Sequence, residues 1–184
     1  MTHHTRSTVS VGFPIVLACT LLLMAGSLLG QAKPVPKPVP MFSASAIQIE
    51  PPDPGDVPMP PEFRMAVYES LISHIEKTGK FQHVYRSGDK DAAAVPDLVT
   101  LRTTAQAFKK GSQKKREVTT VTGATSMTLK VNITDHAGKT ILDRNVKGQV
   151  RFMGENLRAT YDFASRVADI ITEKFYTAGH TTER

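Results

Sequence analysis

The fold of this chain is decided by one stretch, Met127-Thr128-Leu129-Lys130-Val131-Asn132-Ile133-Thr134, which runs directly into Asp135-His136-Ala137-Gly138. Apolar and polar side chains alternate in the first part with a period of two, which is typical of a strand with one buried face. The second part ends in a glycine, which adopts a positive φ without strain. The apolar alternation resumes after Thr140. The sequence therefore predicts a hairpin whose two strands span residues 118–134 and 140–152.

Three more strands are predicted upstream of this hairpin, over residues 44–50, 81–86 and 98–108. The first of them alternates, with Ile47 and Ile49 on one face. The third has a longer alternating face that consists of Val99, Leu101, Thr103, Ala105 and Ala107. Proline-rich sequence between residues 51 and 61 and polar sequence between residues 89 and 96 are typical of loops.

Two amphipathic helices complete the pattern. The first begins at Pro61, because the first helical turn tolerates proline, and ends before Gly79. Its apolar residues recur every four positions: Phe63, Val67, Leu71 and Ile75. The second helix spans residues 155–175, and its apolar stripe comprises Leu157, Tyr161, Ala164, Ala168, Ile171 and Phe175.

This order of elements predicts an α+β fold in a single domain over residues 43–176. We expect two layers, with a mixed, mostly antiparallel sheet of about five strands and two helices packed on one face. The last residues, 177–184, are expected to form a flexible tail.

The amino terminus has the three parts of a secretory signal. Residues 1–8 are polar, the run from Val9 to Leu29 is apolar or small, and Gly30-Gln31-Ala32 has the small residues of a cleavage site. We therefore expect residues 1–32 to be a signal peptide and the protein to be periplasmic or secreted, in the cell envelope.

Two alternatives for this segment stay open. Val16-Leu17-Ala18-Cys19 loosely resembles a lipobox, in which Cys19 would carry a lipid, although the apolar run continues after it. The apolar run is also close to the ~20 residues that span a bilayer, so it could remain as an uncleaved anchor.

A short imperfect repeat comes after the signal, Lys33-Pro34-Val35-Pro36-Lys37-Pro38-Val39-Pro40. Alternate prolines lack the N–H that a helix requires and favour the extended polyproline II conformation. Residues 33–42 are therefore predicted to form a stiff stalk between the signal and the domain.

Composition limits the possible functions. The chain of 184 residues has a formal net charge of +6, which is too small an excess to identify nucleic acid as a partner. Cys19 is the single cysteine. A chain cleaved after Ala32 would have no disulfide, no thiolate nucleophile and no cysteine metal ligand.

The most distinctive local feature is a basic run, Lys109-Lys110-Gly111-Ser112-Gln113-Lys114-Lys115-Arg116, at a predicted strand-to-strand turn. Basic loop tips bind lipid or nucleic-acid phosphates by neutralising their charge. This run contains no aromatic residue for base stacking, and export argues against nucleic acid as a partner. A solvated hairpin tip is the simpler alternative. The candidate contact residues for an anionic surface are Lys109, Lys110, Lys114, Lys115 and Arg116.

No catalytic constellation stands out. The chain has neither a His-Glu-x-x-His motif nor a Gly-x-Ser-x-Gly motif, and it has no phosphate-binding glycine loop. The acidic residues of the two helices, such as Glu69 and Asp162, are interpreted as solvated faces. We therefore expect no enzyme, no metal and no cofactor. A hydrolase with dispersed residues stays open, and a pocket that gathers His83 or His136 with a carboxylate would favour it.

Several of these segments together resemble a known family. They are Gly79-Lys80-Phe81, Asp97-Leu98-Val99, the hairpin turn from Val131 to Thr140, and Val146-Lys147-Gly148. Over residues 43–175 the chain resembles an uncharacterised bacterial envelope family of secreted proteins and lipoproteins, of the domain of unknown function 4410 type. It is more distantly similar to small α+β domains of envelope lipoproteins, such as the curli-secretion pore lipoprotein and activators of penicillin-binding proteins.

The resemblance implies a periplasmic or outer-membrane-associated binding or assembly module, and it brings no catalytic residues. The leading hypothesis is therefore an exported, non-enzymatic envelope module that binds an envelope protein or an anionic envelope component. The alternative is an inner-membrane-anchored, periplasm-spanning coupling protein with a Pro-rich stalk. This alternative is weaker because the chain lacks the Tyr-Pro element of such terminal domains.

Overall fold

The computed structural model describes residues 41–118, 123–150 and 155–178, which belong to one compact unit. The predicted signal sequence, the repeat at residues 33–40 and the end of the predicted tail lie outside the described residues. Met41 and Phe42, the last two residues of the predicted stalk, are described. Phe42 forms a bridge with Phe175, and their ring centroids lie 6.1 Å apart.

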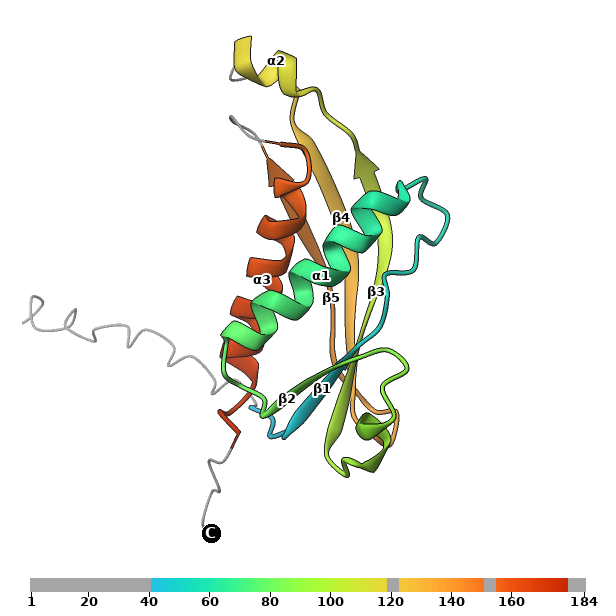
Figure 1. The fold of residues 1–184 in the computed structure, drawn as a ribbon, viewed down its shortest axis with the longest axis vertical. Coiled ribbons are helices and arrows are strands. Elements are labelled where there is room, and N and C mark those ends of the chain that lie inside the picture. The colour runs from blue at the N-terminus through green and yellow to red at the C-terminus, as the bar shows by residue number, and fades with distance from the viewer. Residues whose placement is uncertain (1–40, 119–122, 151–154, 179–184) are drawn as a thin grey trace, which may run out of the picture. The chain divides into compact units, whose positions relative to one another are not determined.

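The domain is a two-layer α+β structure (Figure 1), as predicted. A five-stranded sheet has the order β2-β1-β3-β4-β5. The strands are β1 (Ala46–Ile49), β2 (His83–Arg86), β3 (Leu98–Lys109), β4 (Thr125–Thr134) and β5 (Thr140–Val150). The helices are α1 (Pro61–Lys77), the short α2 (Gln113–Val118) and α3 (Arg158–Lys174), with a 3-10 turn η1 at Asp91–Ala94.

The sheet is mixed because its two halves are connected differently. β1 pairs in parallel with both β2 and β3, and helix α1 makes the crossover between β1 and β2. β3, β4 and β5 form an antiparallel meander that contains the predicted hairpin. Gly138, in the turn of that hairpin, has a φ of 80°. The antiparallel pairings are the longer ones, so they provide most of the sheet's ladder.

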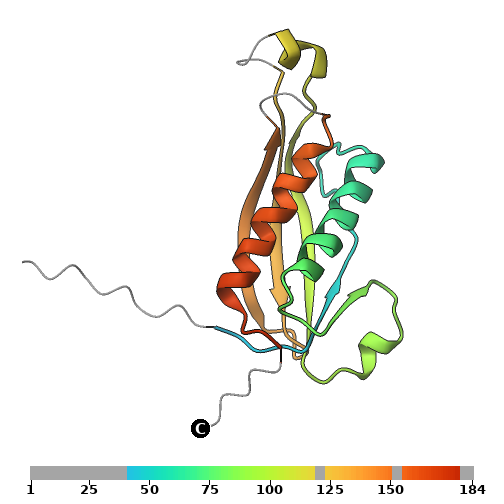
Figure 2. The ribbon, with the colours of Figure 1, turned by 60° about the vertical axis from the view of Figure 1, so that its left-hand side comes forward.

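Helices α1 and α3 lie side by side on one face of the sheet, as both ribbon views show (Figures 1 and 2). The alternation in β4 directs Met127, Leu129, Val131 and Ile133 into the core between the layers. Their partners on the other face, such as Lys130, are polar and at least partly exposed. α1 contributes Phe63, Leu71 and Ile75 to the core, and α3 contributes Phe163 and Ile171.

The sheet and the helical layer approach each other closely at Gly148 on β5. A Cβ at this position would lie 2.3 Å from the Ala159 carbonyl oxygen and 2.5 Å from the Phe163 Cβ, both of α3. Real Cβ atoms do not approach other atoms this closely, so only glycine fits between β5 and α3 here.

Three details of the prediction are wrong. The alternation predicted for β3 breaks at an irregularity between Ala105 and Ala107, which leaves Ala107 exposed. Phe108 instead packs on Phe63, with ring centroids 4.8 Å apart, because the extra residue in the bulge reverses the facing of the residues after it. The second wrong detail is on α3, where the sequence predicts Tyr161 to belong to the buried apolar stripe. The Tyr161 side chain is 58% exposed. The buried face of α3 instead includes Phe163, Val167 and Ile170.

The third detail concerns the start of β4. The predicted strand begins at residue 118, whereas β4 begins at Thr125 and Val118 ends α2. Residues 113–117 are Gln, Lys, Lys, Arg and Glu, all of which favour a helix. The Gln113 side-chain amide donates to the Glu117 carboxylate one turn later at 3.0 Å, which supports the helical turn.

Candidate functional site

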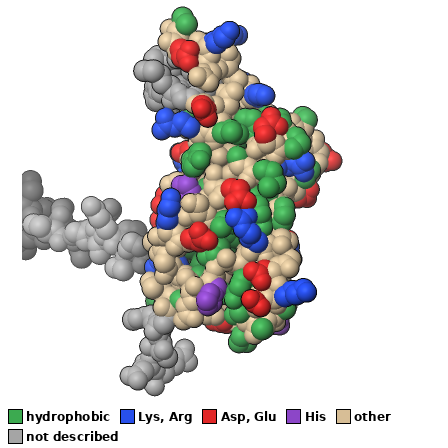
Figure 3. Space-filling model, in the orientation of Figure 1, with side chains coloured by type: hydrophobic (Ala, Val, Ile, Leu, Met, Phe, Trp, Pro, Cys, Tyr) green, Lys and Arg blue, Asp and Glu red, His purple; other side chains and the backbone are tan. Residues whose placement is uncertain are grey.

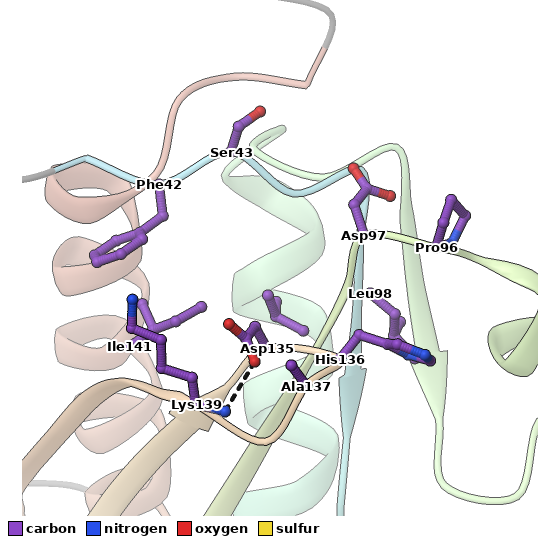
Figure 4. A pocket seen from close by; sticks show the side chains of 11 residues that line it. Phe42, Ser43, Pro96, Asp97, Leu98, Asp135, His136, Ala137, Lys139 and Ile141 are labelled. Carbon is purple, nitrogen blue, oxygen red and sulfur yellow. Dashed lines mark hydrogen bonds between the residues drawn. The ribbon is translucent and has the colours of Figure 1, made fainter.

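A pocket of about 450 Å³ lies at the end of the sheet where the described chain begins. We call it the entry pocket (Figure 4). Three separate segments build it: the lead into β1, the lead into β3, and the β4–β5 turn. Its apolar lining comprises Phe42, Pro96, Leu98, Val99, Ala137 and Ile141. Its polar lining comprises Ser43, Asp97, Asp135, His136 and Lys139.

Hydrogen bonds hold the two carboxylates of the pocket in place. Asp97 accepts the backbone N–H of Ser45 at 2.7 Å with one oxygen and the Ser45 hydroxyl with the other. Asp135 accepts the backbone N–H of Lys139 at 2.8 Å, and this contact closes the β4–β5 turn. Both acids therefore have a structural role and a fixed orientation at the pocket.

The entry pocket brings His136 together with two carboxylates, the combination that would favour a hydrolase. The structure gives no hydrogen bond between His136 and either acid among the described residues. Figure 4 shows the His136 ring pointing away from Asp135, and the Ser43 side chain pointing out of the pocket. The residues share a pocket without the nucleophile–base–acid chain that nucleophilic catalysis requires.

The other described histidines lie elsewhere. His74 on α1 is hydrogen-bonded through Nδ1 to the Ser70 carbonyl at 2.8 Å, and its ring packs edge-on against Tyr161. His83 on β2 stacks on Tyr85, with ring centroids 5.7 Å apart. Within the described ranges, no three His, Cys, Asp or Glu side chains are grouped so that they could hold a metal ion.

The basic run forms the far end of the domain (Figures 1 and 2). We call residues 109–118 the α2 tip. β3 and β4 extend beyond the helical layer and carry this tip at the end opposite to the entry pocket. In the space-filling view, Lys and Arg side chains lie at this end together with acidic side chains (Figure 3). The structure places Lys109, Lys110, Lys114 and Lys115 here with exposed side chains, together with the backbone of Arg116.

Close backbone packing fixes the base of the tip. A Cβ at Gly111 would lie 2.1 Å from the Gly123 carbonyl oxygen, so only glycine fits there. The Ser112 N–H donates to that carbonyl at 3.0 Å, and the Gly111 N–H donates to the Thr125 hydroxyl at 3.0 Å. Next to this junction lies a hollow of about 300 Å³, lined by Lys109, Lys110, Gly111, Ser112, Lys115, Gly123 and Ala124.

An acidic residue, Glu117, lies within the tip beside its cations, and its carboxylate accepts the Gln113 amide. The Lys110 ammonium lies 3.9 Å from the Glu62 carboxylate of α1, and both side chains are more than half exposed. An exposed pair at that separation contributes little. Val118, at the end of α2, is 84% exposed. The tip therefore has more basic residues than acidic ones, beside one exposed apolar side chain, a composition suited to an anionic interface.

Two helix carboxylates that the sequence suggested were solvated have structural partners. Glu69 on α1 forms a two-bond pair with Arg86 on β2, at 2.6 and 2.7 Å. These hydrogen bonds, together with the charge of Arg86, lower the pKa of the Glu69 carboxyl below its ordinary value, against an opposing effect of burial. Asp162 on α3 accepts the backbone N–H of Gln149 at 2.9 Å and so covers part of the exposed edge of β5.

Among the described residues, none of the helices has the length and apolar character needed to cross a bilayer. No family model matches the chain, and neither does any curated protein sequence.

Solved structures of one protein share the fold. Two structures of the PelC dodecamer from Paraburkholderia phytofirmans, one of them a point variant, superpose with TM-scores of 0.55 and 0.54. Their identities to this chain are 7% and 8%, over 76% and 77% of it and 94% of each PelC chain. Protein XCC0632 from Xanthomonas campestris gives a TM-score of 0.43 at 14% identity, over 77% of this chain and 86% of that one. The described domain therefore has the fold of a PelC subunit.

Proposed function

We propose that this chain is an exported, non-enzymatic module of the bacterial cell envelope, and that its α2 tip binds an anionic phospholipid surface. Within this proposal the chain belongs with the uncharacterised envelope family that it resembles in sequence. The contact residues are Lys109, Lys110, Lys114, Lys115 and Arg116. In this proposal these residues contact the surface, and the domain carries out no reaction.

Export is supported by the polar, apolar and small-residue parts of the first 32 residues. A binding or assembly role is supported by the shared fold with PelC, which is a dodecamer in both structures. Self-assembly would place several tips on one particle. Because linked contacts bind far more strongly than single ones, modest affinity per tip would then be sufficient.

The observation that carries the proposal is the position and composition of the α2 tip. The backbone of the tip extends past the helical layer (Figure 1), and the side chains of its four lysines, Lys109, Lys110, Lys114 and Lys115, are exposed there. Each Lys or Arg near an anionic leaflet contributes about 1 kcal/mol. Val118 can insert at the level of the headgroups, and the adjoining hollow of about 300 Å³ can admit a phosphate group.

The experiment measures binding of the full-length chain to vesicles of phosphatidylglycerol and of phosphatidylcholine. We expect strong binding to the anionic vesicles, weak binding to the neutral ones, and release at high salt, where the Debye length falls to about 3 Å. Equal binding to the two kinds of vesicle would contradict the proposal. Binding would then not depend on lipid charge, as expected for an apolar segment that inserts into either lipid. Release by inorganic phosphate at constant ionic strength would identify a free-phosphate site instead of a membrane contact.

A further inference from the structure

We propose that the entry pocket binds the side chain of a lysine or arginine that an extended segment of a partner protein presents. This inference goes beyond the proposed function, since the pocket and the α2 tip lie at opposite ends of the domain. One molecule can therefore hold an anionic surface and a basic partner segment at the same time.

The lining of the pocket matches this kind of side chain. Lysine and arginine have an apolar stem and a charged head, and they bury the stem along apolar surface. Phe42, Leu98 and Ile141 provide apolar surface, while Asp97 and Asp135 provide acceptors for the head. The volume of about 450 Å³ is within the usual range of about 300–1,000 Å³ for ligand sites. It leaves room for the neighbouring backbone of the partner as well as for one long side chain.

Both carboxylates are oriented before a ligand arrives. Asp97 is fixed by two donors of Ser45, and Asp135 by the Lys139 N–H. An ionised carboxylate offers about four lone-pair positions, so each acid keeps acceptor capacity for a ligand. Because the domain has already ordered these side chains, binding costs less conformational entropy than it would for mobile acids.

The charge of the pocket also favours a cation. Two carboxylates outweigh one ammonium group, that of Lys139. In Figure 4 the Lys139 side chain runs toward Phe42, on the side of the pocket away from Asp97. The pocket therefore has a net excess of one negative charge from these three side chains. An anionic ligand would meet both carboxylates there and would be repelled.

The test uses three blocked pentapeptides that differ only at the central position, between pairs of valines: lysine, norleucine or glutamate. Binding to the full-length chain in detergent is measured by calorimetry. We expect the lysine peptide to bind best, the norleucine peptide more weakly, and the glutamate peptide least. Equal affinity for the lysine and norleucine peptides would overturn the proposal, because the pocket would then select apolar chains alone.

The variant Asp135→Asn removes the charge but keeps an oxygen that can accept the Lys139 N–H. It should weaken the lysine peptide about tenfold, as expected for losing one charge-assisted hydrogen bond. It should leave the norleucine peptide unchanged. The matched control is Asp56→Asn, which removes the same charge from an exposed position in the loop before α1. An equal effect of the two variants would refute a specific role of the pocket.

A second variant, Lys139→Gln, removes the competing cation and should tighten the lysine peptide severalfold. Cleavage of any peptide during the assay would contradict a binding site and identify a hydrolase. Vesicle binding by the α2 tip should be unchanged in Asp135→Asn, so failure here is distinguishable from failure of the proposed membrane contact.

Discussion

Neutralising two lysines of the α2 tip, Lys109→Gln with Lys114→Gln, should greatly weaken binding to anionic vesicles. Both side chains are exposed, and Lys110 is left in place because Glu62 already lies 3.9 Å from its ammonium. At about 1 kcal/mol for each cation near an anionic leaflet, the double variant loses about 2 kcal/mol of binding free energy. Since about 1.4 kcal/mol corresponds to a factor of ten, the partition coefficient should fall about thirtyfold.

The assay is cosedimentation with phosphatidylglycerol vesicles, with the bound fraction measured as lipid is added. The matched control is Lys77→Gln with Lys90→Gln, which removes the same charge from exposed positions outside the tip. We expect the control to bind within about twofold of the unchanged protein, because only charges within about a Debye length of the surface contribute fully. The conservative pair Lys109→Arg with Lys114→Arg should bind as strongly as the unchanged protein, since it keeps both charges.

Similar losses in the tip and control variants would refute this reasoning, because binding would then depend on net charge and not on the tip. No loss in either would exclude the tip as the membrane contact. The ratio between tip and control variants should also shrink as salt is added, because screening weakens both sets of charges.

Two further predictions concern the fold that positions these sites. Gly148→Ala should lower the free energy of unfolding in urea by about 3 kcal/mol, because the new Cβ would contact backbone of α3 that cannot rotate away. The control Lys147→Ala, on the exposed face, should change that free energy by less than about 0.5 kcal/mol. An unchanged unfolding midpoint for Gly148→Ala would contradict the packing of β5 on α3. Glu69→Gln should lower the free energy of unfolding by less than about 1 kcal/mol at neutral pH, because the ion pair is exposed. The difference in stability between Glu69→Gln and the unchanged protein should vanish as the pH falls through the titration range of the carboxyl, because a lowered folded-state pKa stabilises only the ionised form. A difference that persists unchanged in acid would exclude the ion pair with Arg86 as its cause.

The parts of the fold that depend on local periodicity could be predicted from the sequence. The alternation from Met127 to Ile133 gives the buried face of β4, and the spacing from Phe63 to Ile75 gives α1, because both patterns lie within single elements. The bulge near Gln106 has no signal of its own. Phe108 turns inward because it packs on Phe63, a residue from another element, and a local pattern carries no information about that contact.

The two candidate sites also differ in how far the sequence alone predicts them. The α2 tip is continuous in sequence and could be identified from its charge, although its helix could not be told from a turn. The entry pocket joins residues near 42, 97 and 135, which only the tertiary fold brings together. In the sequence, the segments containing Asp97 and Asp135 carry only the turn and strand signals of the family resemblance. Their chemistry emerges only once the sheet aligns the start of β3 beside the β4–β5 turn.

The most direct test of the account is intact mass and amino-terminal sequencing of the protein recovered from a bacterial envelope fraction. The account predicts a soluble, exported chain that begins at Lys33, after removal of residues 1–32. A chain that keeps its amino terminus in the inner membrane, or one that begins at a lipid-modified Cys19, would contradict cleavage after Ala32. Recovery of the protein only from the cytoplasm would contradict the central claim, that this domain acts in the cell envelope.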